Sequence, residues 1–253
     1  MLTAIEKLAQ FILHAKEILI FTGAGISTES GISDYRSKGG LWDRFQPVTF
    51  QEFLVSQEKR EQYWRQKMEL YESLENAQPN AGHKAIAELE QLGKLKGIIT
   101  QNIDGLQQLA GSDPNKILEL HGSTRETICL SCGEIKPWQE VYERLKSGDG
   151  APLCYRCKGI LKPNTISFGQ PLNPEVLAKA IEWAGDCDLL LALGSTLVVE
   201  PAASIPRMAK QQDAKLVIVT LSETPLDAFA DIKIENGIGK ILSEVLNLIK
   251  AKR

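Results

Sequence analysis

Four of the five cysteines stand in two pairs with the spacing of metal ligands: Cys129 with Cys132, and Cys154 with Cys157. A Cys-x-x-Cys turn directs two thiolates at one point, so two such turns complete a tetrahedral sulfur site for zinc. Four thiolates leave no open coordination position, which predicts a structural zinc, with iron–sulfur ligation as the minor alternative. The fifth cysteine, Cys187, lies beside a predicted strand and is expected to be a buried apolar residue.

A second chemical motif follows the first predicted strand, where Gly23, Ala24 and Gly25 form a Gly-x-Gly turn. Such a turn lets the backbone approach a pyrophosphate and offers amide donors to it. The dinucleotide fingerprint has a third glycine where this chain has Thr28, so an ordinary tight turn stays open as the alternative. Three ionisable side chains follow in the same loop and favour capture of a cofactor: Asp34, Tyr35 and Arg36.

Polar side chains also follow three further predicted strands, at the end of each strand. The segment Gln101-Asn102-Ile103-Asp104 follows the first, His121 the second, and Gly194-Ser195-Thr196 the third. In an open parallel sheet, the ligand crevice lies beyond the carboxyl ends of the strands. Turn or capping chemistry explains any one of these groups, but all three together with the glycine turn predict an active site.

His121 is the candidate general base, because an imidazole ordinarily titrates near neutral pH. His14, near the end of the first amphipathic stretch, is expected on the surface or in packing, and His83 is expected to make structural hydrogen bonds. The sequence has neither the order of a Ser-His-Asp triad nor a nucleophile elbow, so a hydrolase triad has no support.

The elements that must position these groups alternate between strand and helix. Amphipathic helical stripes begin near Ile5, Val176 and Ile238. Seven short apolar runs are predicted to be strands buried on both faces, at 18–21, 97–100, 117–120, 164–168, 188–193, 216–220 and 232–234. The alternation predicts an α/β fold with an open, doubly wound, mostly parallel sheet.

Two regions interrupt this alternation and are interpreted as insertions that leave the sheet and return to it. Residues 38–78 are polar and aromatic and predict a loop followed by short helices, while residues 127–162 hold the cysteine pairs. The chain is therefore expected to form a large domain and, inserted into it, a small helical and zinc-ribbon domain. The large domain would comprise 1–37, 79–126 and 163–253, and the small domain 38–78 and 127–162.

Composition excludes several classes of protein. Of the 253 residues, 43% are hydrophobic and 24% are charged, which argues for a globular core and against disorder. The formal net charge of −3 gives no global attraction to nucleic acid or to an acidic membrane surface. No run approaches the roughly 18 apolar residues of a membrane helix, and the first residues lack the pattern of a signal peptide. These features predict a cytoplasmic protein without a stable nucleic-acid or membrane partner.

Together the motifs resemble the sirtuin family of NAD-dependent protein deacylases. The resemblance runs in order over almost the whole chain and rests on 23–27 (GAGIS), 31–36 (GISDYR), 100–105 (TQNIDG), 121–122 (HG), 168–170 (FGQ), 194–199 (GSTLVV) and the four paired cysteines. It implies a compact catalytic core of the bacterial or archaeal type, with a Rossmann-type large domain. It also implies NAD as a co-substrate and zinc as a structural metal.

The resemblance also assigns roles to individual residues. It implies that His121 deprotonates the ribose hydroxyls, while Asn102 and Asp104 hold nicotinamide and its ribose, so these three are the expected catalytic residues. The implied cofactor-binding residues are Gly23, Ala24, Gly25, Thr28, Asp34, Tyr35, Arg36, Gln101, Asn102, Ile103, Asp104, Gly194, Ser195, Thr196, Leu221, Ser222 and Ile238. The implied substrate-binding residues are Phe168, Gly169, Val198 and Val199.

The implied reaction is deacylation of protein lysines, which consumes NAD and releases nicotinamide and O-acyl-ADP-ribose. Acylated protein lysines are thus the expected partners. The nearest rival is transfer of ADP-ribose to a protein at the same site, a reaction with less need of the base His121. Two further alternatives are less favoured. A hydride-transferring dehydrogenase lacks support because the third fingerprint glycine is missing, and a zinc-ribbon module for nucleic acid lacks support because the net charge is negative.

Several residues depart from the family pattern: Ser33, Tyr35, Gln107, Gln170 and Thr220. Thr220 stands where an asparagine commonly bonds the adenosine ribose, and Gln170 removes a charge at the rim of the substrate clamp. The Tyr and Arg that recognise succinyl groups in some members have no counterpart at the same spacing near Tyr63, which favours uncharged acyl groups. None of the departures removes a catalytic residue, so an active enzyme is expected.

Overall fold

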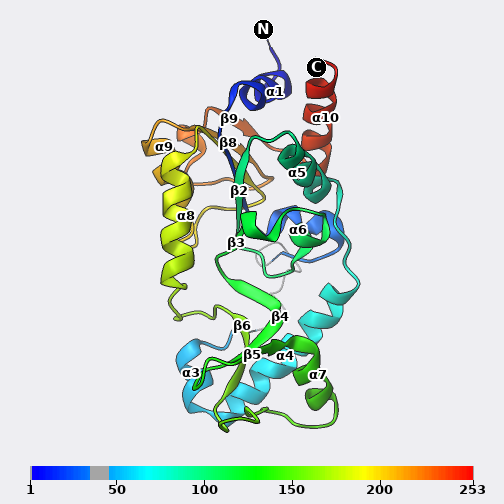
Figure 1. Cartoon of the computed structure of the whole chain (residues 1–253), viewed down its shortest axis with the longest axis vertical. Coiled ribbons are helices and arrows are strands. Elements are labelled where there is room, and N and C mark those ends of the chain that lie inside the picture. Colours follow the sequence, from blue (N-terminus) through cyan, green and yellow to red (C-terminus); the bar gives the residue numbers. More distant parts are fainter. Residues whose placement is uncertain (1, 35–45, 253) are drawn as a thin grey trace.

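The computed structural model describes residues 2–34 and 46–252, and within them six strands form a parallel sheet in the order β3-β2-β1-β7-β8-β9 (Figure 1). The strands are β1 (Ile18–Thr22), β2 (Leu95–Thr100), β3 (Ile117–Glu119), β7 (Leu189–Leu193), β8 (Lys215–Val219) and β9 (Ile232–Ile234). The central strands β1 and β7 are buried along their whole length, as their continuous apolar sequences require. The predicted doubly wound α/β fold is confirmed.

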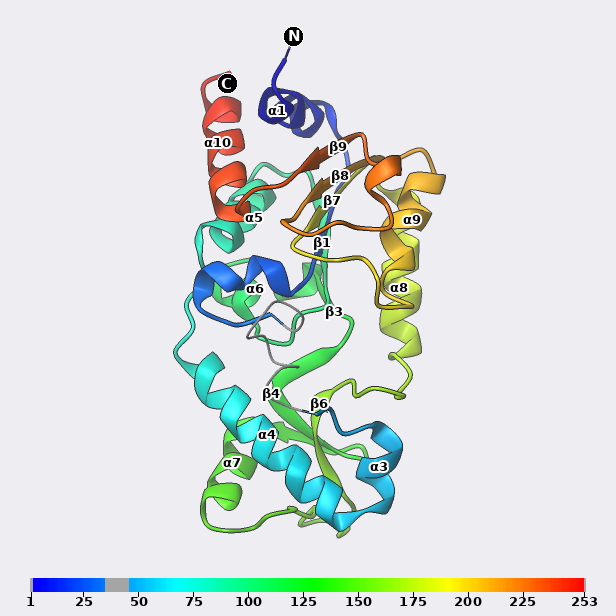
Figure 2. The ribbon, with the colours of Figure 1, turned by 180° about the vertical axis from the view of Figure 1, so that it is seen from behind.

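Helices cover both faces of this sheet (Figure 2). One face carries α1 (Ala4–His14), α5 (Ala81–Gln91) and α10 (Ile238–Lys250), and the other carries α8 (Pro174–Asp186) and α9 (Ser204–Gln211). Successive side chains of β1 point to opposite faces, so Ile18 and Ile20 enter the first core whereas Leu19 and Phe21 enter the second. Two apolar cores therefore hold the sheet from both sides.

A smaller antiparallel sheet with the order β5-β4-β6 lies at the end of the molecule remote from α1 and α10 (Figure 1). Its strands are β4 (Gly122–Cys129), β5 (Ile135–Pro137) and β6 (Leu161–Thr165), and its helices are α3 (Phe50–Val55), α4 (Gln57–Glu75) and α7 (Trp138–Lys146). The rings of Trp64 and Trp138 pack at 5.7 Å in its core. Of the short helices predicted within 38–78, α3 is short with 6 residues, whereas α4 spans 19 residues and is longer than predicted.

The strand predicted at 164–168 is wrong in its bounds and in its sheet. Strand β6 ends at Thr165 and pairs antiparallel with β4 instead of joining the parallel sheet. The apolar residues Ile166 and Phe168 made the segment resemble a buried strand, but they follow β6 and line a cavity, and Phe168 is 49% exposed. Apolar side chains here line a cavity instead of filling a sheet core.

The carboxyl ends of the parallel strands face the smaller sheet. Strand β3 ends at Glu119 and β4 begins at Gly122, so only Leu120 and His121 separate the two sheets along the chain. The short helix α6 (Leu106–Leu109) follows the end of β2 in the same region. The domain boundaries stay a prediction. Within the described ranges, no helix combines the length and the apolar character needed to cross a membrane.

Candidate active site

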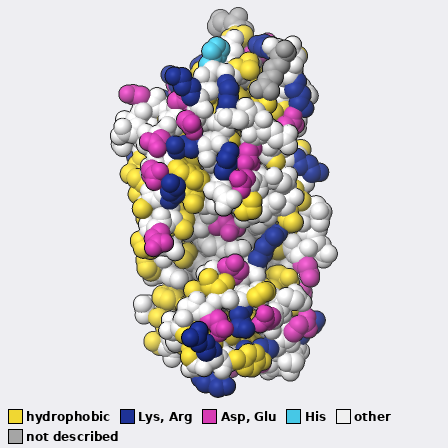
Figure 3. Space-filling model, viewed as in Figure 1, with side chains coloured by type: hydrophobic (Ala, Val, Ile, Leu, Met, Phe, Trp, Pro, Cys, Tyr) yellow, Lys and Arg dark blue, Asp and Glu magenta, His cyan; other side chains and the backbone are white. Residues whose placement is uncertain are grey.

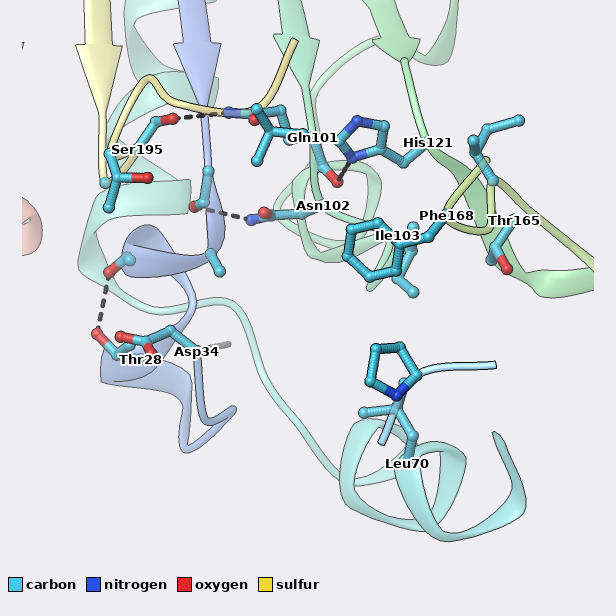
Figure 4. A pocket seen from close by; sticks show the side chains of 18 of the residues that line it. Thr28, Asp34, Leu70, Gln101, Asn102, Ile103, His121, Thr165, Phe168 and Ser195 are labelled. Atoms are coloured by element: carbon cyan, nitrogen blue, oxygen red, sulfur yellow. Dashed lines mark hydrogen bonds between the residues drawn. The ribbon is translucent and has the colours of Figure 1, made fainter. Parts of the chain in front are cut away.

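A cavity of about 530 Å³ lies between the two sheets, at the carboxyl ends of the parallel strands. Figure 4 shows its lining from close by, and Figure 3 shows that acidic and basic side chains are interspersed over one face of the molecule. The lining includes most of the residues that the sequence nominated: Gly23, Ala24, Gly25, Thr28, Asp34, Gln101, Asn102, Ile103, His121, Phe168, Gly169, Gly194, Ser195, Thr196, Val199, Leu221, Ser222 and Ile238. Segments far apart in the sequence thus meet at one concave site.

The glycine turn is packed directly against the end of β7. The amides of Gly23 and Gly25 donate to the carbonyl oxygens of Leu193 and Gly194, at 3.0 and 2.8 Å. A Cβ atom added at Gly23 or Gly25 would lie 2.8 Å from the Gly194 oxygen, which is closer than side chains can approach. The two glycines therefore serve close backbone approach, and their amides are used inside the fold, so they are not the phosphate donors that the sequence pattern predicted.

Amide side chains after β2 connect three loops of the site. Gln101 Nε2 donates to Ser195 Oγ at 2.8 Å, and Asn102 Nδ2 donates to the Gly23 oxygen at 3.1 Å and to Ser27 Oγ at 3.2 Å (Figure 4). These bonds fix the rotamers of both amides and tie the ends of β1, β2 and β7 together. A ligand that enters the cavity therefore meets a preorganised polar wall.

Asp104 lies behind this wall and is not one of the lining residues. Its Oδ2 accepts a hydrogen bond of 2.7 Å from Ser27 Oγ, and its Oδ1 accepts one of 2.9 Å from the Leu106 amide. Sequence reasoning did not nominate Ser27 as a site residue, although it lies within the glycine motif. The Ser27 hydroxyl thus links the carboxylate of Asp104 to the amide of Asn102.

His83 is buried close to this network. Its amide donates to Asn80 Oδ1 at 3.3 Å, and its carbonyl oxygen accepts from Gln107 Nε2 at 3.3 Å. Burial lowers the pKa of its imidazole, against the opposing charges of Asp104 and Glu29. Its Nδ1 is buried and has no hydrogen-bond partner within the part of the chain that the structure describes, so the expected structural hydrogen bonds come from its backbone.

His121 is the one histidine that lines the cavity. Its Nδ1 lies 2.8 Å from the Gln101 carbonyl oxygen, which accepts hydrogen bonds and cannot donate them, so Nδ1 carries the proton (Figure 4). The neutral ring therefore has an unprotonated Nε2, the atom that a general base needs. Burial lowers the pKa of His121 below its usual value, and the bond to Gln101 opposes that shift. His14 lies on the surface of α1 and bonds the Gln10 oxygen at 2.8 Å.

Apolar side chains form the opposite rim of the cavity. The exposed ring of Phe168 lies beside Ile103 (Figure 4), and its carbonyl oxygen accepts a 2.8 Å hydrogen bond from the Phe50 amide. Val199 also lines the cavity, whereas Val198 is 50% exposed outside the lining. Two exposed apolar edges, from the segment after β6 and from the segment after β7, thus border the entrance.

The far end of the cavity is formed by the loop after β8 and the N-terminus of α10. Leu221 is 77% exposed there, and Thr220 is buried with its Oγ1 accepting from the Ser222 amide at 3.4 Å. Thr220 lines the cavity, so its hydroxyl lies at the end where the sequence placed the adenosine. Tyr35 and Arg36, also assigned to the cofactor, lie outside the described residues.

The structure brings the sulfur atoms of Cys129, Cys132, Cys154 and Cys157 within 4.8 Å of one another. Cys129 and Cys154 are buried, and Cys132 and Cys157 are exposed. The four thiols have the identity and clustering that tetrahedral zinc requires. Cys187 is buried at the end of α8, as expected for an apolar residue.

Sequence reasoning missed the wall that the smaller sheet contributes to the cavity. Six lining residues come from the segment before α3 and from α4: Pro47, Val48, Tyr63, Gln66, Lys67 and Leu70. No local motif marks them, because they reach the cavity only through the docking of α4. The face that they occupy on α4 repeats every three to four residues, the only signal that the sequence offered.

Comparisons with known proteins agree with this geometry. The Sir2 family model matches residues 23–201. A relative from Thermodesulfovibrio yellowstonii, named NAD-dependent protein deacetylase, is 45% identical over 98% of this chain and 96% of its own length. An Archaeoglobus fulgidus relative named NAD-dependent protein deacylase 2 is 40% identical over 98% and 97%.

Solved structures are similar over the same extent. One described as "Structural Basis for the Mechanism and Regulation of Sir2 Enzymes" superposes with a TM-score of 0.88 at 40% identity, covering 99% of each chain. Another, described as "Sir2-p53 peptide-NAD+", has a TM-score of 0.85 at 32% identity and covers 98% of this chain and 99% of its own. On its sequence and its fold, the chain belongs to the Sir2 family.

Proposed function

We propose that the protein is an NAD-dependent protein-lysine deacylase that releases nicotinamide and O-acyl-ADP-ribose. The observation that carries the proposal is the position of His121, which lines a cavity together with the glycine turn and the apolar rim of Phe168 and Val199, and whose Nδ1 bond leaves Nε2 unprotonated. Relatives with 40–45% identity over the whole chain carry the names deacetylase and deacylase. The rival transfer of ADP-ribose to a protein has less need of this base and is not favoured.

The described residues fit NAD at the carboxyl ends of the strands. Gly23, Gly25 and Gly194 pack so closely that added Cβ atoms would clash, which leaves the turn free of side chains where a dinucleotide must approach. When bound, NAD supplies an electrophilic ribose carbon and nicotinamide as a neutral leaving group. Ala24 and Thr28 would border its phosphates, Asn102 its nicotinamide end, and Leu221 and Ser222 its adenosine end. Asp104 would act from behind the wall, through Ser27, which also bonds Asn102.

In this proposal His121 accepts a proton at Nε2 from a ribose hydroxyl, while its Nδ1–H remains bonded to the Gln101 oxygen. That bond holds the ring in one tautomer and stabilises the cation that forms. Gln101 is in turn oriented by Ser195, and Asn102 by Gly23 and Ser27. The site therefore positions its base through bonds that exist before substrate arrives.

The acyl-lysine would enter between the loop that holds Phe168 and the segment that holds Val199. Exposed backbone on both sides suits an extended peptide bound as an added strand, which reads main chain more than sequence. The acyl group would meet Ile103, Ile166 and Leu70, whose apolar side chains favour an uncharged acyl chain. Acylated protein lysines are the proposed partners, and the net charge of −3 supports no stable nucleic-acid or membrane partner.

Zinc would serve the smaller sheet and not the chemistry. The four sulfur ligands would join the C-terminal end of β4 to the segment before β6. Cys129 and Cys154 belong to the same buried cluster as Trp64 and Trp138. Thiolate ligation requires reduced cysteines, which supports a reducing compartment such as the cytoplasm.

The test is to incubate the protein with NAD and an acetyl-lysine peptide and to follow the peptide mass and nicotinamide. The proposal expects loss of the acetyl group only when NAD is present, and loss of that activity in His121→Ala. Peptide that keeps its acetyl group while NADH forms with an alcohol would instead support a dehydrogenase. Full activity in His121→Ala would refute the assignment of the base.

A further inference from the structure

The phenol of Tyr63 joins α4 to the segment that carries Phe168. Tyr63 is buried and lines the cavity. Its Oη lies 3.1 Å from Ser167 Oγ and 3.4 Å from Thr165 Oγ1. Thr165 is the last residue of β6, and Ser167 directly precedes Phe168. The phenol therefore contacts the segment from both sides of Ile166, at the rim where the acyl-lysine is proposed to bind.

Other hydrogen bonds of this segment involve its backbone, and the Ile166 amide donates to the His121 oxygen at 2.8 Å. The Ser167 amide donates to Gln170 Oε1 at 3.1 Å, which closes the turn on itself, and the Phe168 oxygen accepts from the Phe50 amide at 2.8 Å. Among the hydrogen bonds of the described residues, Tyr63 supplies the side-chain contacts from α4 to this segment. Its loss would loosen Thr165 and Ser167, on either side of Ile166.

Two lysines face the Tyr63 side chain from different elements. Lys67, one turn further along α4, has its Nζ 5.3 Å from the centre of the ring, and Lys162 of β6 has its Nζ 5.5 Å from it. Lys162 is completely buried, and its Nζ donates to the carbonyl oxygens of Pro163 and Thr165. Within the described ranges, neither lysine forms an ion pair with a carboxylate.

Apolar side chains from other elements also pack around Tyr63. Phe53 of α3 packs its ring edge-on at 4.9 Å, and Val48, Leu130 and Ile160 complete the apolar surroundings. Burial alone would raise the pKa of Tyr63, but the charges of the two lysines and the hydrogen bonds of Ser167 and Thr165 bring it down to about 7. Burial also lowers the pKa of Lys162, against the attraction of Tyr63.

We propose that Tyr63 is a positioning residue for the acyl-lysine substrate: its Oη holds the hydroxyls of Thr165 and Ser167 and thereby fixes the ring of Phe168. The two lysines that face its ring favour the phenolate form of Tyr63. The inference rests on the proposed function, because Phe168 matters only if a peptide binds there. A phenolate accepts stronger hydrogen bonds from two hydroxyls than a neutral phenol does. Peptide binding is therefore expected to tighten as the pH rises through about 7.

The test measures binding of a fluorescent acetyl-lysine peptide by anisotropy, without NAD, from about pH 6 to about pH 9. We expect the dissociation constant of the wild type to fall about fivefold across this range, the size of one or two hydrogen bonds. Tyr63→Phe should bind about fivefold more weakly at the upper end and show no pH dependence. Tyr71→Phe is the matched control, because Tyr71 lies on the same helix and its hydroxyl bonds Gln139 instead.

A second readout needs neither peptide nor activity. The phenolate absorbance of the wild type minus that of Tyr63→Phe should titrate near pH 7, and Lys67→Gln or Lys162→Met should move that midpoint upward. A midpoint near the ordinary value of 10, or unchanged peptide binding in Tyr63→Phe, would overturn the inference. Failure of the wild type to deacetylate peptides would count against the proposed function. Peptide binding and the phenolate titration would still test the role of Tyr63, because neither depends on deacetylation.

Discussion

The close packing of Gly194 against the glycine turn makes Gly194→Ala a strong test of how the cavity is built. Gly194 has a φ of +66°, a left-handed conformation that alanine adopts at a cost of about 1–2 kcal/mol. A Cβ atom there would lie 2.6 Å from the Gly25 carbonyl carbon and 2.9 Å from Gly25 Cα, so the turn must shift. Overpacking of this kind costs about 1–3 kcal/mol. The expected loss in free energy of unfolding is therefore about 2–5 kcal/mol.

Two other glycines separate these contributions. Gly93, after α5, has a φ of +75° and no atom within 4 Å of an added Cβ, so Gly93→Ala should lose only the backbone cost of about 1–2 kcal/mol. Gly185, inside α8, has neither a positive φ nor a nearby atom, so Gly185→Ala should be neutral or stabilising by up to about 1 kcal/mol.

The assay is urea unfolding of the three variants, together with NAD affinity by calorimetry. Gly194→Ala should be the least stable and should bind NAD at least about tenfold more weakly, because its clash displaces the turn that borders the cofactor. Gly93→Ala and Gly185→Ala should bind NAD as the wild type does. If Gly194→Ala matched Gly93→Ala in both stability and NAD affinity, the argument from close packing would be wrong.

Three further predictions concern the metal, the base and the acyl group. Cys132→Ser should lose the bound zinc measured by elemental analysis, whereas Cys187→Ala should keep it, since Cys187 lies apart from the four-sulfur cluster; equal zinc in both would contradict the site. Burial lowers the pKa of His121, and its neutral form is the base, so kcat at saturating peptide should fall only as the pH drops below about 6.5. A midpoint of the kcat profile well above that value would exclude His121 as the base. Acetyl-lysine peptides should react faster than succinyl-lysine peptides in parallel rate measurements, because the cation Lys67 faces Tyr63 and the side chains proposed to meet the acyl group, Ile103, Ile166 and Leu70, are apolar. A preference for succinyl would show that Lys67 serves the acyl group.

Local patterns predicted the parts of the fold that depend on local sequence. The apolar run of β1, the glycine turn after it and the two cysteine pairs each need only a short segment, and the structure contains all three as expected. The strand predicted at 164–168 was wrong for a physical reason. Ile166 and Phe168 are apolar because they line a cavity, and periodicity alone cannot separate that use from a sheet core.

Other parts of the site depend on contacts between distant segments. Ser27 bonds Asp104 across 77 residues, and Tyr63 bonds Ser167 across 104, so neither contact has a signal in the local sequence. The amides of Gly23 and Gly25 are used by Leu193 and Gly194, a pairing set by the strand order β1–β7. The residue types and their positions after the strands thus predicted which segments form the site. The hydrogen bonds that hold these segments together could be seen only in the folded structure.

The most direct measurement is a complete account of ADP-ribose in one reaction with an acetyl-lysine peptide. Mass spectrometry should find one O-acetyl-ADP-ribose for each nicotinamide released and each lysine freed. His121→Ala should form no O-acetyl-ADP-ribose and no free lysine, and should release nicotinamide for a single turnover at most. That result is expected if His121 acts on the ribose after nicotinamide has left. ADP-ribose found attached to protein, with the acetyl group still on the peptide, would contradict the account.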